Sequence, residues 1–282
     1  MKDTSRTIKA AIAALTGLFL VFFNPGLVDA TVNKLLLGLT ENGSVAMGSV
    51  PALRMYVSSY WRGLEVIVGA ALIAMAIAFY MGKKWAFPIS MVALAIVPVG
   101  SFYTGLLFMV KTKSLPPAWI AFIIGLLAFW AMLFLEKKEK PWAFFVPLTI
   151  LGMIGTQAFA FAEHGLRGIF PDLTASVTDP TIGVLRFSGP IMAFLVPILL
   201  FSIWALSAGK ESGWWASLVV GFSMAVASFP VHFARPKASM ALPGTAEASI
   251  FTSTYFLGGA LGVILVVVML IPYFKNQFVS QE

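Results

Sequence analysis

Two charged residues inside one apolar segment are the first candidates for chemistry. Arg62 and Glu65 lie near the start of the run Tyr60–Lys84, which is long and apolar enough to cross a bilayer. Residues three apart on a helix are neighbours, so we expect an ion pair. An ionisable group within a span is otherwise a candidate site for a cation or a proton. At a depth of about one helical turn below the outer surface, we favour the structural pair, with Arg62 reaching the headgroups.

The only two histidines are a second candidate site. His164 and His232 each follow an apolar segment, on the same side of the membrane in the topology given below. Two histidines from neighbouring helices can ligate a haem b iron or a metal ion. No spacing such as HxxxH accompanies them, and the chain has no cysteine to supply a thiolate. We therefore expect no cofactor, and keep haem or metal at His164 and His232 as the alternative.

Uncharged polar residues in the apolar segments are a third set. Such groups can bind a solute, but they also form hydrogen bonds between helices. Interior prolines bend helices and free carbonyl groups that can line a cavity. We expect at least three of the prolines to face one common interior. The polar candidates are Thr156, Gln157, Ser223 and Ser228, and the prolines are Pro88, Pro98, Pro147, Pro190 and Pro197.

Basic residues gather in segments that we place on the outer face. They could focus an electrostatic field that attracts anions, or they could contact lipid headgroups or a partner protein. The pattern does not choose between these roles. The cluster comprises Arg54, Arg167, Arg186, Arg235 and Lys237. The lipid bilayer is the expected partner, and the outer loops 30–59, 163–186 and 233–249 are where protein partners could bind.

Composition identifies the class of protein. Of the 282 residues, 59% are hydrophobic and 11% are charged, whereas a soluble domain carries about 25% charged residues. The net charge of +7 would suggest nucleic acid in a soluble protein. Here the Lys and Arg residues stand at the ends of apolar segments, which is typical of membrane topology signals. We expect an integral membrane protein that does not bind nucleic acid.

The apolar segments predict an all-α polytopic protein with about eight transmembrane helices. A short amphipathic stretch after the first span, Gly26–Leu39, is expected to lie in the membrane interface. The leader could also be a cleaved signal peptide with Val28-Asp29-Ala30 as its site, but we interpret it as a retained span. The expected spans are 10–27, 60–82, 85–110, 118–135, 142–162, 187–206, 214–232 and 250–274.

The connections between spans suggest an internal duplication. They run long, short and medium across the first four spans and again across the last four. The short turns are also alike, Gly82-Lys83-Lys84-Trp85 in one half and Gly209-Lys210-Glu211-Ser212-Gly213-Trp214 in the other. Two four-helix halves, 1–140 and 141–282, would follow, although apolar helices with basic stops also resemble one another by composition. Small residues at Ser217, Gly221, Ala225, Gly258 and Gly262 predict close helix packing.

These features favour transport of a small solute. The alternative is a membrane-embedded subunit or anchor of a larger respiratory or periplasm-facing complex, with partners at the outer loops. An enzyme is disfavoured because the chain has few histidines, no cysteine and no paired intramembrane carboxylates. Substrate, coupling ion, partners and oligomeric state are not encoded in any pattern that we find.

Topology gives the first prediction. Basic residues crowd the short connections at 83–84, 137–140 and 210, so both termini should be cytoplasmic, in an inner membrane if the protein is bacterial. Reporter fusions after Lys140 and after Lys275 should therefore both score as cytoplasmic. A periplasmic score for either, or a mature protein beginning at Thr31, would contradict the eight-span arrangement.

Overall fold

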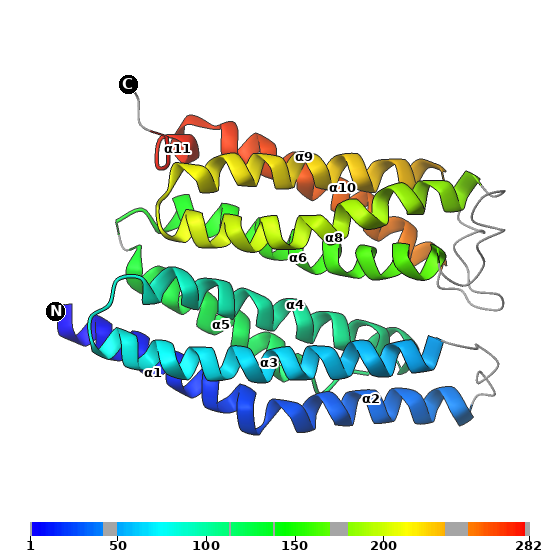
Figure 1. Cartoon of the computed structure of the whole chain (residues 1–282), viewed down its shortest axis with the longest axis horizontal. Helices are drawn as coiled ribbons and strands as arrows, with labels where there is room; N and C mark the ends of the chain where they lie inside the picture. Colours follow the sequence, from blue (N-terminus) through cyan, green and yellow to red (C-terminus); the bar gives the residue numbers. More distant parts are fainter. Residues whose placement is uncertain are drawn as a thin grey trace. The chain divides into compact units, whose positions relative to one another are not determined.

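The computed structural model describes residues 2–41, 50–112, 114–137, 139–169, 180–234 and 248–279, and within them the regular structure is helical. Within each of the two units described below, Figure 1 shows the long helices lying roughly side by side. Their bounds are α1 Lys2–Phe22, α2 Asn24–Glu41, α3 Val50–Tyr80, α4 Ala86–Thr112, α5 Trp119–Glu136, α6 Pro141–Ile169, α8 Pro180–Ser207, α9 Glu211–Ala234, α10 Ala248–Leu270 and α11 Pro272–Lys275.

Seven helices of the described part are long and apolar enough to cross a membrane, and the stretch Thr254–Leu270 of α10 is a shorter apolar helix. Many large apolar side chains on these helices are exposed, including Phe22, Ile67, Phe194 and Phe222. In water this surface would be unfavourable, whereas lipid covers it. The protein is an all-α polytopic membrane protein, as the sequence predicts.

The chain divides into two compact units, Met1–Pro141 and Trp142–Glu282. The first contains α1 to α5, and the second contains α6 to α11. Each unit packs its own helices around buried aliphatic, aromatic and small side chains, such as Leu72 and Leu94 in the first and Met192 and Leu265 in the second. Each unit is therefore described by itself.

The first apolar segment and the helix after it form one interrupted rod. α1 ends at Phe22, and α2 begins at Asn24, where Pro25 lacks the N–H that would bond to the preceding turn. Figure 1 shows α2 continuing beyond α1 along α3. Its residues Val28 and Leu35 are buried, since α2 packs on α3 and α4. The predicted helix after the first span is confirmed. An interfacial helix would cross the ends of the other helices, whereas α2 runs alongside them.

Helix α3 is longer than the sequence suggested, and this changes the depth of Glu65. The helix begins at Val50 and has 31 residues, so Glu65 is its central residue. The apolar span within it begins at Val57, which places Glu65 about 12 Å along the axis from that end at 1.5 Å per residue. Glu65 therefore lies well inside the span instead of one turn below its start.

Pairs of glycines bring helices into close contact in both units. A Cβ at Gly17 of α1 would lie 2.6 Å from the carbonyl oxygen of Gly69 in α3. A Cβ at Gly221 of α9 would lie 2.7 Å from the carbonyl oxygen of Gly262 in α10. The absence of side chains at these positions lets the backbones approach, which is how small residues drive helix association in lipid. The close packing predicted for Gly221 and Gly262 is confirmed.

The two short turns that look alike in sequence also share their hydrogen bonds. Gly82 and Gly209 have φ angles of 73° and 71°, and each ends a long helix. The N–H of Lys83 donates to Ala78 at 2.9 Å, and that of Lys210 donates to Ala205 at 2.8 Å. Both turns are thus the same glycine-dependent helix cap. Equivalent residues of the two turns lie 127 positions apart. This constant spacing fits an internal duplication of the chain, and the duplication stays a prediction.

The five prolines do not share one type of environment. Pro190 and Pro197 of α8 are exposed on the surface of the second unit, whereas Pro88 and Pro147 are buried and Pro98 is half-buried. Pro98 is covered by α5, because a Cβ at Gly125 would lie 3.2 Å from its ring. The buried prolines belong to different units, so the expectation of a common proline-lined interior stays a prediction.

The glycine contacts yield a test of packing with a matched control on the same helix. Gly69→Ala should lower the thermal unfolding midpoint of the detergent-purified protein, because the new methyl group would lie 2.8 Å from the Gly17 carbonyl oxygen. Gly63→Ala should leave it unchanged or raise it, since nothing lies within 4 Å and alanine favours a helix by about 1 kcal/mol. Equal midpoints for the two variants would contradict the α1–α3 contact.

Candidate functional site

A buried carboxylate held by two neutral side chains is the centre of the first unit. Glu65 of α3 has only 1% of its surface exposed. The Asn24 Nδ2 group donates to its Oε2 at 2.5 Å, and the Ser101 hydroxyl donates to its Oε1 at 2.9 Å. Both carboxylate oxygens therefore accept a hydrogen bond, and both donors are uncharged.

The three residues come from three consecutive helices, Asn24 from the start of α2, Glu65 from the centre of α3 and Ser101 from the middle of α4. Asn24 is the first residue after the interruption between α1 and α2, and it is 1% exposed. Ser101 lies one turn beyond Pro98 in α4 and is fully buried. Because α2, α3 and α4 pack on one another, the start of α2 lies beside the middle of α3 and of α4. The polar cluster is consequently remote from both ends of α3 and of α4.

A tryptophan and a glycine pack directly against the Glu65 carboxylate. Trp61 precedes Glu65 by one turn and is 5% exposed. A Cβ at Gly100 of α4 would lie 2.5 Å from the Trp61 ring and 3.0 Å from the Glu65 Oε1 atom. The indole and the carboxylate thus converge on the bare backbone of Gly100. A side chain there would force one of them away.

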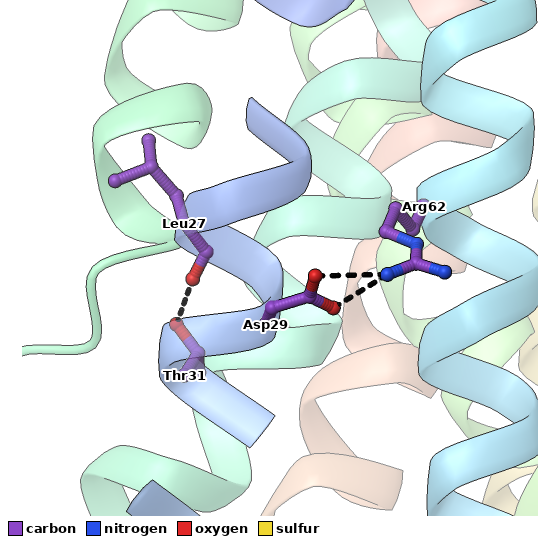
Figure 2. A network of polar contacts seen from close by, with 4 residues as sticks. All are labelled: Leu27, Asp29, Thr31 and Arg62. Carbon is purple, nitrogen blue, oxygen red and sulfur yellow. Dashed lines mark hydrogen bonds and ion pairs between the residues drawn. The ribbon is translucent and has the colours of Figure 1, made fainter. Parts of the chain in front are cut away.

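The predicted ion pair between Arg62 and Glu65 is wrong. The Arg62 Nη1 atom instead contacts both carboxylate oxygens of Asp29 in α2, at 2.7 and 2.9 Å (Figure 2). Three residues correspond to a rotation of 300° on a helix, so the two side chains point about 60° apart. Glu65 points into the bundle, while Arg62 and Asp29 stay 41% and 51% exposed. Arg62 joins α2 to α3 at the periphery.

The α2 helix makes a second polar contact next to this pair. The Thr31 hydroxyl donates to the Leu27 carbonyl oxygen at 2.8 Å, as Figure 2 shows, and accepts from the Ala118 N–H at 2.9 Å. Ala118 precedes α5, so Thr31 satisfies one of the N–H groups that every helix start leaves without an intrahelical partner. This contact ties α2 to α5 and positions Asn24 two turns away.

Basic groups lie at the end of the first unit where α1 begins and α5 ends. Lys9 of α1 forms an ion pair with Glu136 at the end of α5 and lies 5.6 Å from the centroid of the Phe79 ring. Lys137 lies 5.7 Å from the Phe87 centroid. Burial lowers the pKa of Lys137 and the Glu136 carboxylate opposes the change. These contacts join the ends of α1, α3, α4 and α5 far from Glu65.

The polar candidates of the second unit differ in their surroundings. The Thr156 hydroxyl donates to its own helix at the Gly152 carbonyl oxygen, 3.3 Å away, so it is occupied locally. Ser223 is half-buried. The Gln157 Oε1 atom and the Ser228 hydroxyl are buried and have no hydrogen-bond partner among the described residues. These two are the members of the set whose polar atoms stay available.

The histidines and the outer basic residues are only partly described. His232 lies against the rings of Phe233 and Phe256, with centroids 4.9 and 5.2 Å away. His164 lies in α6, but its side chain is outside the described part, so a shared iron or metal stays a prediction. Among the described residues no cluster of three metal-binding side chains is found. Of the basic cluster, Arg186 is exposed in α8, Arg54 and Arg167 are placed by backbone alone, and Arg235 and Lys237 fall outside the described residues.

Sequence reasoning missed Asn24, Ser101 and Asp29 as functional partners. Asn24 was visible as a polar residue directly before Pro25 within an apolar run, which marks an interruption whose side chain must find a partner. Ser101 gave no comparable signal, because serines in spans usually bond to their own helix. The partner of Arg62 depends on the direction of α2, and this direction is decided only by how α2 packs on the other helices.

The arrangement can hold a proton or bind a cation. A charged side chain at the centre of a span costs about 2.5–3.5 kcal/mol on insertion scales. Hydrogen bonds to a charged group contribute about 1.5–3 kcal/mol each, but neither of the two donors supplies an opposite charge. A proton on the carboxyl group or a cation beside it removes the uncompensated charge.

Comparison with protein-family models, curated proteins and solved structures found no match. The function must therefore be inferred from the site itself.

Two double-mutant cycles test the pairing of Arg62. Combining Arg62→Gln with Asp29→Asn should give a coupling energy of about 0.2–1 kcal/mol in detergent unfolding, as measured for exposed ion pairs. Combining Arg62→Gln with Glu65→Gln should give a smaller coupling, because Glu65 has other partners. A larger coupling in the second cycle would restore the Arg62–Glu65 pair.

Proposed function

We propose that the protein is a secondary transporter of a small solute, in which Glu65 carries the coupling proton or monovalent cation. The observation that carries this proposal is the placement of Glu65. It is buried at the centre of α3, and the described groups that hydrogen-bond to it, Asn24 and Ser101, are neutral. Intramembrane carboxylates without a paired cation mark proton and ion pathways in membrane proteins.

The Asn24 side chain suits a group that changes its protonation state. Its Nδ2 atom donates to the carboxylate, whereas its buried Oδ1 atom has no partner among the described residues. When Glu65 is protonated, a half-turn of the amide brings Oδ1 to the carboxyl group, where it accepts the new O–H. One side chain can therefore satisfy both forms of Glu65, so neither form leaves a buried donor facing another donor.

The interruption between α1 and α2 supports the same proposal. In transporters, discontinuous helices place free backbone groups and ion sites near the middle of the bilayer. Here the interruption is at Phe23 and Asn24, and Asn24 is itself a partner of the carboxylate. A change at Glu65 is thereby linked to the angle between α1 and α2. The proposal includes cytoplasmic termini, with the Arg62–Asp29 pair nearer the outer face.

Glu65→Gln is the decisive variant. The amide can accept from Ser101 and donate to Asn24 Oδ1, so the protein should fold with an unfolding midpoint close to the wild-type value. It can neither release a proton nor balance a cation. In proteoliposomes with an internal pH dye, a solute that drives proton movement in wild type should fail to do so in the variant. With a cation as coupling ion, the same loss should appear in uptake driven by a sodium gradient.

The matched control is Glu211→Gln. Glu211 is an exposed carboxylate in the first turn of α9, where it accepts a hydrogen bond from Trp215 at 3.1 Å. This control should keep wild-type coupling, which shows that loss of a carboxylate as such is harmless. A well-folded Glu65→Gln protein with coupling intact would make Glu65 structural and end the proposal.

A further inference from the structure

Two buried polar atoms of the second unit lack described hydrogen-bond partners, and both lie on helices that contact α10. The Oε1 atom of Gln157 in α6 has no hydrogen-bond partner among the described residues, and neither has the hydroxyl of Ser228 in α9. Ser228 is completely buried. An unmatched polar atom in a protein interior is unfavourable by about 1–3 kcal/mol. Such atoms persist where something other than the helix bundle satisfies them.

The tenth helix brings the two atoms to neighbouring levels. A Cβ at Gly258 of α10 would lie 2.7 Å from both Gln157 Oε1 and the Met224 methyl carbon, and 2.9 Å from the Phe161 ring. Ser228 follows Met224 by one turn of α9, on the same face. Gln157, Met224 and Gly258 therefore form one layer, and Ser228 belongs to the next layer toward the end of α9.

An aromatic pair borders the same region. The rings of Phe161 and Tyr255 are stacked, with centroids 3.9 Å apart and planes inclined by 16°. Phe161 follows Gln157 by one turn of α6, and Tyr255 precedes Gly258 by one turn of α10. The Gln157 Oε1 atom thus lies close to the edge of a stacked aromatic pair. Such a combination of few polar groups and apolar surface is typical of sites for small ligands.

We propose that Gln157 and Ser228 bind the transported solute, and that this solute is a small uncharged molecule with an N–H or O–H donor. The inference rests on the proposed function, because it names the substrate class of that transporter. The Gln157 Oε1 atom only accepts hydrogen bonds, so the ligand must donate. The Ser228 hydroxyl can accept or donate, which suits an amide or an alcohol.

The surroundings argue against a charged ligand. The three side chains nearest to a Cβ at Gly258 are Gln157, Met224 and Phe161, and none of them carries a charge. An ion in this setting would lose its hydration without an opposite charge to replace it. In the structure Met224 fills the space beside Gly258, so a ligand enters only when this flexible, unbranched side chain moves aside. A neutral ligand about the size of acetamide satisfies these constraints.

The first unit offers a comparison at the same offset of 127 residues as the two helix caps. Ser228 corresponds to Ser101, and Met192 of α8, which is fully buried, corresponds to Glu65. Both units therefore keep a buried serine, but the second has an apolar residue in place of the carboxylate. This difference fits a division of roles in which the first unit takes the ion and the second takes the neutral solute.

Charge-matched isosteres test the inference on the full chain in mild detergent. Acetamide and low concentrations of urea should raise the thermal unfolding midpoint saturably, whereas acetate and guanidinium should not, since ligand binding to the folded state stabilises it. Gln157→Met and Ser228→Ala should each weaken acetamide binding about tenfold, the effect of losing one hydrogen bond. Both substitutions remove a polar group that makes no described hydrogen bond, so folding should survive.

Two controls separate this site from the ion site. Thr156→Val removes a neighbouring hydroxyl that bonds only to its own helix in the described structure, and should leave acetamide binding unchanged. Glu65→Gln should also bind acetamide normally while losing coupled transport. If Glu65→Gln binds and transports normally, the coupling role fails and the solute site stands. No saturable response to either neutral probe, equal responses to the charged isosteres, or full binding by Gln157→Met would overturn the solute site.

Discussion

The burial of one carboxylate constrains the architecture of the first unit. Glu65 can stay at the centre of α3 only if donors reach both of its oxygens. A regular helix has no free N–H at its middle, so the donors must be side chains from its neighbours. Ser101 provides one, and Asn24 provides the other because α1 and α2 are separate helices that meet beside α3. The interruption and the carboxylate therefore depend on each other.

Close helix contacts are the second requirement of this site. Asn24 and Ser101 have short side chains, which reach Glu65 only when the backbones lie close together. The glycine contact between Gly17 and Gly69 draws α1 onto α3, and Gly100 lets Trp61 and Glu65 rest against the backbone of α4. In lipid, where apolar surface gains little from burial against other apolar surface, such contacts supply much of the association energy. The same residues that fold the unit thus set the geometry of the carboxylate.

The two units use a similar scaffold for different electrostatic tasks. Their long helices α3 and α8 end in the same cap at Gly82 and Gly209, with matching hydrogen bonds. The first unit has an ionisable group at its centre and two ion pairs, Lys9–Glu136 near one end and Arg62–Asp29 at the periphery. The second has uncharged polar groups, Gln157 and Ser228, in the corresponding interior. The interior of the first unit thus holds an ionisable group, whereas these polar groups of the second are neutral.

The sequence by itself determined the membrane class, the helical fold and the positions of most helices, because hydropathy depends on composition over a window of about 20 residues. It also identified Glu65 as unusual and the Gly82 and Gly209 turns as alike. The length of α3 and the direction of α2 were not determined, since the residues before Tyr60 and after Asn24 are amphipathic and fit several placements. The partners of Arg62 and Glu65 were decided only by tertiary structure. Their spacing along the helix predicted that they pair with each other. The packing of α2 and α4 against α3 instead places Asp29 beside Arg62, and Asn24 and Ser101 beside Glu65. A side chain in a helical bundle finds its partner across the helix interface, and no spacing along one helix records where that interface lies.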